Sequence, residues 1–85
     1  MIKVEILTAP GCVHCEEAKK IIYKVKNEFP NIKVEIIDVT ENYEVAQKYM
    51  LMTAPGITIN GKLEFIGVPE EDRLRRILRE LSRRE

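Results

Sequence analysis

Tryptophan is absent from this 85-residue chain, which also contains only two cysteines and one histidine. The fourteen basic residues equal the fourteen acidic ones, so the chain lacks the basic excess that a nucleic-acid-binding domain of this length usually carries. Long apolar runs are missing too, because charged residues interrupt the N-terminal residues 1–7. We therefore expect no signal peptide and no membrane span, and a cytoplasmic protein that binds neither nucleic acid nor membranes.

Cysteine and histidine, which are common zinc ligands, are also scarce in this chain. A structural zinc ion normally needs four protein ligands, whereas Cys12, His14 and Cys15 are the only cysteines and histidine in the chain. His14 and Cys15 are also adjacent, so they do not converge easily with Cys12 on one tetrahedron. We expect no metal site within one chain, while a metal ion or iron-sulfur centre shared between two chains stays open.

The first half of the chain predicts a strand, a helix and a second strand. Polar and apolar residues alternate over residues 3–7, and β-branched residues are concentrated in residues 32–39. Between these segments, apolar residues at helical spacing predict a helix that begins at the cysteines and ends before Pro30. A strand, a helix and a strand in this order favour a parallel crossover.

The next segments predict a short helix and a hairpin. Thr40 or Asn42 can cap a helix that runs to about residue 49. Two strands are predicted over residues 57–59 and 63–66, joined by Asn60-Gly61 in a type I′ turn, because both turn residues tolerate positive φ. The residues expected to face inward are Tyr43, Ala46 and Tyr49 or Met50. The apolar residues 50–52 are expected to join the core, and an adaptable apolar rim near Pro55 is the alternative.

Gly67-Val68-Pro69 opens a last helix, which has one apolar stripe and arginines on its other faces. The arginines of residues 73–84 suggest a patch for nucleic acid or for an acidic protein, but we favour a solvated helix surface, because Glu80 and Glu85 are interleaved with them. Residues 1–85 then form a single α/β domain of order βαβ–αββα, with a four-stranded mixed sheet and helices on both faces. The apolar stripe consists of Leu74, Ile77, Leu78 and Leu81.

Cys12-Val13-His14-Cys15, between the first strand and the first helix, is the feature that points to chemistry. Two thiols at this spacing let one sulfur attack a disulfide while the other, one helical turn on, stays within bonding reach. Cys12 is the expected nucleophile, because its sulfur lies near unpaired N–H groups at the positive end of the helix dipole. Cys15 is expected to be less accessible and to release the substrate; a pair of inert core thiols is the alternative.

Four motifs together characterise the chain: Thr8-Ala9-Pro10-Gly11-Cys12-Val13-His14-Cys15, Thr53-Ala54-Pro55, Asn60-Gly61 and Phe65-Ile66-Gly67. With them the whole chain resembles the thioredoxin-fold superfamily, in particular the small archaeal-type thioredoxins and glutaredoxin-like proteins. The resemblance implies a minimal thioredoxin fold and a redox-active Cys12–Cys15 disulfide with no bound cofactor. It also implies disulfide-containing protein substrates and a flavin-containing thioredoxin reductase as electron donor. We expect a monomer.

The same resemblance implies a substrate-binding set around the cysteines. Pro55 matches the family's cis-proline, and the backbone of Ala54 is expected to pair with an extended substrate segment. Gly67 matches the glycine that lets the substrate backbone approach closely. Pro10 and His14 flank the thiols and complete the set. For His14, partial protonation that helps stabilise a thiolate and a solvent-facing spacer are both open.

Several residues depart from the superfamily patterns. Ile6 stands six residues before the first cysteine, where many thioredoxins bury an aspartate, so proton transfer must use another base or water. The glutaredoxin glycine pair reads Gly67-Val68, although Glu70 stands near the acidic position expected to hold the amino group of glutathione. The predicted function is reduction of protein disulfides. Glutathione-dependent, glutaredoxin-like activity is the first alternative, and a non-enzymatic metal- or partner-binding module is the second.

Overall fold

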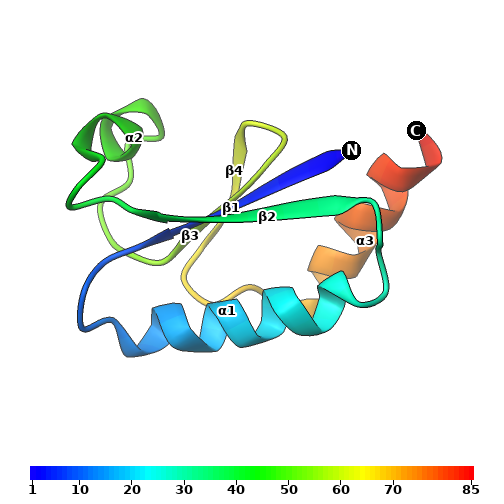
Figure 1. Ribbon diagram of the computed structural model, residues 1–85, viewed down its shortest axis with the longest axis horizontal. Helices are drawn as coiled ribbons and strands as arrows, with labels where there is room; N and C mark the ends of the chain where they lie inside the picture. Colours follow the sequence, from blue (N-terminus) through cyan, green and yellow to red (C-terminus); the bar gives the residue numbers. More distant parts are fainter.

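A computed structural model describes residues 1–85 and shows four strands and three helices in the order β1, α1, β2, α2, β3, β4 and α3 (Figure 1). This order is the predicted βαβ–αββα arrangement. None of the three helices has the length and apolar character needed to cross a membrane. The elements are β1 Ile2–Thr8, α1 Val13–Lys26, β2 Ile32–Asp38, α2 Tyr43–Lys48, β3 Gly56–Ile59, β4 Lys62–Ile66 and α3 Glu71–Arg83.

The four strands form one mixed sheet in the order β2-β1-β3-β4. β1 and β2 are parallel along their whole length, because α1 carries the chain back before β2 begins. β3 is antiparallel to β1, and β4 is antiparallel to β3. The four-stranded mixed sheet expected from the sequence is confirmed.

Alternate residues of β1 face different helices. Val4 and Ile6 belong to the core cluster that includes residues of α1 and α3. Glu5 points to the opposite face, where the hydroxyl of Tyr49, the residue after α2, donates a hydrogen bond to its carboxylate over 3.2 Å. Figure 1 shows α1 and α3 on one side of the sheet and α2 on the other, so the prediction of helices on both faces is confirmed.

Aliphatic side chains from α1 and α3 fill the core on the first face. Ile22 and Val25 of α1 and Leu74 and Leu78 of α3 are all 1% exposed or less. Burial of each such side chain stabilises the fold by roughly 1.5–3 kcal/mol. The apolar stripe predicted for α3 is confirmed, with Leu74 and Leu78 buried and Ile77 and Leu81 packed against the cluster.

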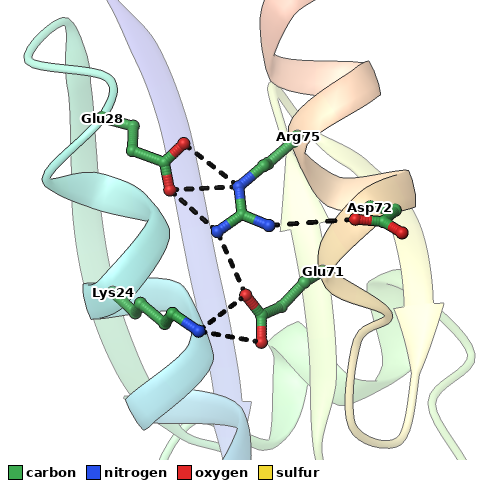
Figure 2. A network of polar contacts seen from close by, with 5 residues as sticks. All are labelled: Lys24, Glu28, Glu71, Asp72 and Arg75. Atoms are coloured by element: carbon green, nitrogen blue, oxygen red, sulfur yellow. Dashed lines mark hydrogen bonds and ion pairs between the residues drawn. The ribbon is translucent and has the colours of Figure 1, made fainter.

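α1 and α3 are also joined by an ion-pair network on the protein surface (Figure 2). Arg75 of α3 lies 2.8 Å from Glu28, just beyond α1, and 3.1 Å from Glu71 on its own helix. Lys24 of α1 reaches the same Glu71 carboxylate over 3.2 Å. The network therefore ties the C-terminal half of α1 to the first turns of α3.

α2 differs from its prediction in what it buries. The helix spans six residues, none of them buried, and its N-cap Asn42 makes no side-chain capping bond. Tyr43 is 66% exposed, so the prediction that it faces inward is wrong. Of the two alternatives at the end of the helix, Met50 is 83% exposed, whereas Tyr49 is half-buried and bonds to Glu5 of the sheet. Met52 is 92% exposed, which also makes its assignment to the core wrong. The cause is that α2 is too short to carry an apolar stripe, and that the chain leaves it through Met50 at a φ of 52°.

The β3–β4 hairpin forms as predicted and is held against the start of β1. Asn60 and Gly61 have φ values of 50° and 82°, as a type I′ turn requires. The backbone N–H of Asn60 donates to the carbonyl of Lys3 over 2.8 Å. In return, the N–H of Lys3 donates to the Asn60 Oδ1 over 2.9 Å. The turn is thus anchored at the end of the sheet where β1 begins.

Candidate active site

Three loops leave the same end of the sheet. Leu7, next to the last residue of β1, lies opposite Gly56, the first residue of β3. Gly56 in turn lies opposite Ile66, the last residue of β4. The loop after β1, the loop before β3 and the loop after β4 therefore begin or end side by side. They contain Cys12, Ala54-Pro55 and Gly67 respectively.

Cys12 and Cys15 form a disulfide with their Cα atoms 5.2 Å apart. Cys12 is the N-cap of α1 in an extended conformation, and its Sγ accepts a hydrogen bond from the N–H of Cys15 over 3.1 Å. Cys15 is only 2% exposed, whereas Cys12 is half-buried. Cys12 is therefore the more exposed of the two cysteines.

The position of Cys12 favours negative charge on its sulfur. The side chain lies at the N-terminus of the 14-residue α1, where unpaired N–H groups and the helix dipole stabilise an anion. Glu16 in the first turn of α1 acts in the opposite direction, because its carboxylate repels a thiolate. Lys19 is the one lysine or arginine among the residues that line the cavity beside the disulfide.

Lys19 and Asp38 line a cavity of about 560 Å³ beside the disulfide. The Lys19 side chain is 28% exposed, and its Nζ lies 3.5 Å from a carboxylate oxygen of Glu16. The sequence predictions do not include either residue. Lys19 is four residues after Cys15 on a helix, and Asp38 ends the strand beside β1. The predicted helix and strand therefore already placed both residues near the cysteines. The cavity is also lined by Pro10, Cys12, Cys15 and Glu16.

Asp38 is held as a carboxylate by its neighbour Thr40. The Asp38 Oδ1 accepts hydrogen bonds from the Thr40 hydroxyl over 2.6 Å and from the Thr40 N–H over 2.9 Å. The hydroxyl bond, followed by the backbone bond, lowers the pKa of Asp38. Ile6, at the position where many thioredoxins bury an aspartate, is fully buried in the core. The disulfide therefore has a hydrophobic side chain where those proteins have an acid.

Pro55 and Gly67 are joined directly across the sheet end. The Ala54–Pro55 peptide bond is cis, and Pro55 is buried. The N–H of Gly67 donates to the carbonyl of Pro55 over 2.8 Å. Gly67 has a φ of 96°, and a Cβ added there would meet no atom within 4 Å. The backbone of Gly67 thus borders open space, which a side chain would enter.

The structure divides the predicted site residues into groups. Pro10 lies in the cavity with the cysteines, whereas Ala54, Pro55 and Gly67 lie in the adjacent loops. His14 is exposed in the first turn of α1 and does not line the cavity. No group of three or more His, Cys, Asp or Glu side chains is placed to hold a metal ion.

Exposed apolar side chains accompany these loops; of them, only Met52 was considered from the sequence, as the less favoured alternative to a core residue. Val13 follows Cys12 directly and is 71% exposed, and Met52 precedes the cis-proline and is 92% exposed. Ile66, immediately before Gly67, is 65% exposed. Exposed apolar side chains grouped in this way are typical of surfaces that bind other proteins.

A family model described as thioredoxin domain matches residues 2–79. The chain belongs to the thioredoxin family. It is 45% identical over 74 residues to a thioredoxin from Methanocaldococcus jannaschii, covering 86% of this chain and 87% of that protein. A probable thioredoxin from Methanothermobacter marburgensis is 39% identical over 75 residues, covering 87% and 88% of the two chains.

Solved structures agree with this membership. A protein disulfide oxidoreductase from Aeropyrum pernix matches with a TM-score of 0.80 at 30% identity, over 96% of this chain and 38% of that one. A thioredoxin from Trypanosoma brucei brucei matches with a TM-score of 0.79 at 28% identity, over 98% and 76%. Together with the Cys12–Cys15 disulfide, family membership makes the protein a thioredoxin-like thiol-disulfide oxidoreductase. The predicted fold, superfamily and reaction class are confirmed.

Proposed function

We propose that the protein reduces disulfides in other proteins in two steps, with Cys12 as nucleophile and Cys15 as resolving thiol. In the first step the Cys12 thiolate attacks one sulfur of the substrate disulfide, forming a mixed disulfide and releasing the other substrate sulfur as a thiolate. In the second step the Cys15 thiolate attacks the Cys12 Sγ, forming the Cys12–Cys15 disulfide and releasing the second substrate thiolate. Two electrons pass to the substrate.

The accessibility of the two sulfurs is the observation that carries this assignment. Cys12 is half-buried at the N-cap of α1, and Cys15 is 2% exposed one turn deeper. A large disulfide substrate reaches the first sulfur and not the second. The Cys15 sulfur is within bonding reach of the Cys12 sulfur, so it needs no movement of the helix to resolve the mixed disulfide.

The loops beside the disulfide supply a binding surface for an extended substrate segment. The backbone of Ala54 can pair with such a segment as a strand does, which tolerates many side chains. Gly67 leaves room for the substrate backbone, Pro10 lies in the cavity with the thiols, and His14 lies between them in the sequence. The exposed side chains of Val13, Met52 and Ile66 add apolar contact. Protein disulfides therefore suit this surface better than small disulfides.

Thioredoxin reductase is the proposed electron donor, with no bound cofactor in the protein itself. Residues 1–85 act as one domain and as a monomer in the cytoplasm. Glutathione is the second candidate donor, because Glu70 is the N-cap of α3 directly after the Gly67 loop. Val68 occupies the second position of the glutaredoxin glycine pair, which favours the reductase over glutathione.

Insulin reduction with dithiothreitol tests the reaction itself. The wild-type protein should accelerate precipitation of the insulin B chain, and Cys12→Ser should abolish that acceleration. Full activity in Cys12→Ser would remove Cys12 from the proposed role. Supplying electrons from NADPH through thioredoxin reductase, or from glutathione, then separates the donors. Faster turnover with glutathione would assign the protein to glutaredoxin-like activity instead.

A further inference from the structure

A second cavity lies at the opposite end of the molecule from the disulfide. It has a volume of about 660 Å³ and runs between the β3–β4 hairpin and α3. The hairpin turn at Asn60 is bonded to Lys3 near the start of β1, whereas the disulfide follows the end of β1. The seven residues of β1 separate the two sites by roughly 20 Å. We call this cavity the arginine groove, lined by Lys62, Arg76, Arg79, Arg83 and Arg84 with Glu64 and Glu80.

The arginine groove is cationic in a chain whose formal net charge is zero. Its two carboxylates are already paired, Glu64 with Lys62 over 3.8 Å and Glu80 with Arg84 over 3.4 Å. Arg76 and Arg79 are exposed and make no salt bridge, although Arg79 is near enough to Glu28 to help lower its pKa. Two guanidinium groups are therefore free to bind an anion.

The floor of the groove is apolar. Ile59 of β3 is 2% exposed, and Ile77 and Leu81 of α3 are half-buried. Guanidinium groups around such a floor fit a ligand that presents carboxylates and aliphatic side chains together. Arginine recognises carboxylates through two parallel hydrogen bonds, which adds direction to the charge attraction.

We propose that the arginine groove binds an acidic segment of a partner protein, independently of the disulfide. The α3 surface from Arg76 to Arg84 is about 12 Å long, which accommodates an extended segment of about four residues. Nucleic acid fits less well, because no aromatic side chain lines the groove to stack on a base, and because Glu64 and Glu80 repel a continuous phosphate backbone. The sequence interpretation favoured a solvated surface over a patch for an acidic protein, and it did not include the hairpin that completes the groove.

Fluorescence anisotropy with a labelled peptide of repeated Glu-Glu-Leu tests the proposal. The peptide should bind the wild-type protein, and binding should weaken at least about tenfold in the double variant Arg76→Glu with Arg79→Glu. Affinity should also fall as salt is raised, because the contacts are exposed. The matched control is Lys20→Glu with Lys48→Glu, which makes the same charge change on exposed lysines outside the groove that form no salt bridge.

Three results would overturn the proposal. They are no binding of the peptide, an equal loss in the lysine control, and tighter binding of a single-stranded RNA oligonucleotide than of the peptide. If the glutamate variant does not fold by circular dichroism, Arg76→Gln with Arg79→Gln replaces it and should still weaken binding. Insulin reduction should be unchanged in these variants, so a failure here is distinguishable from a failure of the proposed disulfide reduction.

Discussion

Lys19 is the cation in the cavity beside the disulfide, where no buried aspartate assists the cysteines. Its positive charge should stabilise a thiolate on either sulfur. In Lys19→Met, alkylation of the reduced protein by iodoacetamide should slow about threefold at neutral pH, as expected for loss of one charge several Å away in water. The pH profile of the alkylation rate should move to higher pH.

Lys20→Met is the matched control for this experiment. Lys20 is the next residue on α1, is exposed, and does not line the cavity. Its alkylation profile should coincide with that of the wild type. Coincidence of the Lys19→Met profile with the wild type as well would show that the cavity cation has no influence on the thiols.

Gly67 and Gly61 form a matched pair for testing the substrate surface. Both have positive φ, and a Cβ at either residue would meet no atom within 4 Å. Each change to Ala should therefore lower the free energy of unfolding by about 1 kcal/mol. Only Gly67→Ala should raise the KM for insulin, by about tenfold, because only Gly67 lies beside the cis-proline. Equal KM values in the two variants would rule out close approach of substrate at Gly67.

The residues of the proposed site were identified from the sequence, but their surroundings were only partly predictable. Cys12, Cys15, Pro55 and Gly67 stand in motifs that are read along the chain. Asp38 is brought to the disulfide by the pairing of β2 with β1, and its bonds to Thr40 depend on the local backbone after β2. Such contacts depend on the three-dimensional fold, whereas the spacing of apolar residues predicts only which face of a helix or strand is buried.

At the scale of elements, the network of Figure 2 joins the helix that carries the cysteines to the helix after Gly67. Arg75 is central, because it contacts both Glu28 and Glu71. Arg75→Ala should lower the melting temperature measurably. Arg76→Ala, the neighbouring exposed arginine without a salt bridge, should change it little. Equal melting temperatures in the two variants would show that the network adds no stability.

The same network should make the stability of the folded protein depend on pH. The hydrogen bond from Arg75 lowers the pKa of Glu28, and the hydrogen bond from Lys24 lowers the pKa of Glu71. A lowered pKa in the folded state stabilises the protein above the ordinary glutamate pKa of 4.5, and this stabilisation is lost as pH falls through the folded value. The melting-temperature difference between wild type and Arg75→Ala should therefore be constant near neutrality and shrink below pH 4.5. A difference that grows in acid would contradict this assignment.

The buried faces of elements with a strong periodic signal were predicted well, whereas for α2 the position was predicted and the buried face was not. The buried residues of β1, α1 and α3 follow the spacing that their strands and helices impose. α2 has only six residues, so Tyr43 and Met50 could be assigned a face only by assuming packing that the fold does not supply. The exposed Met52 instead lies in the surface of the cis-proline loop.

At the scale of the whole molecule, the folded protein extends 34 Å along its longest axis and has two separate surfaces of different chemistry. The disulfide, the cis-proline and exposed apolar side chains occupy one end, and the arginine groove occupies the other. The sequence shows a net charge of zero and arginines spread along α3, which hides this separation. Those arginines line a groove only because the β3–β4 hairpin lies beside α3.

Trapping of the mixed disulfide is the most direct test of the two-step exchange. Reduced Cys15→Ser protein, mixed with a disulfide-containing protein substrate, should accumulate a covalent adduct. Mass spectrometry of the digested adduct should show the substrate cysteine joined to Cys12, and Cys12→Ser protein should form far less adduct. An adduct that forms equally well through Cys15, or no adduct with either variant, would contradict the assignment of Cys12 as the nucleophile.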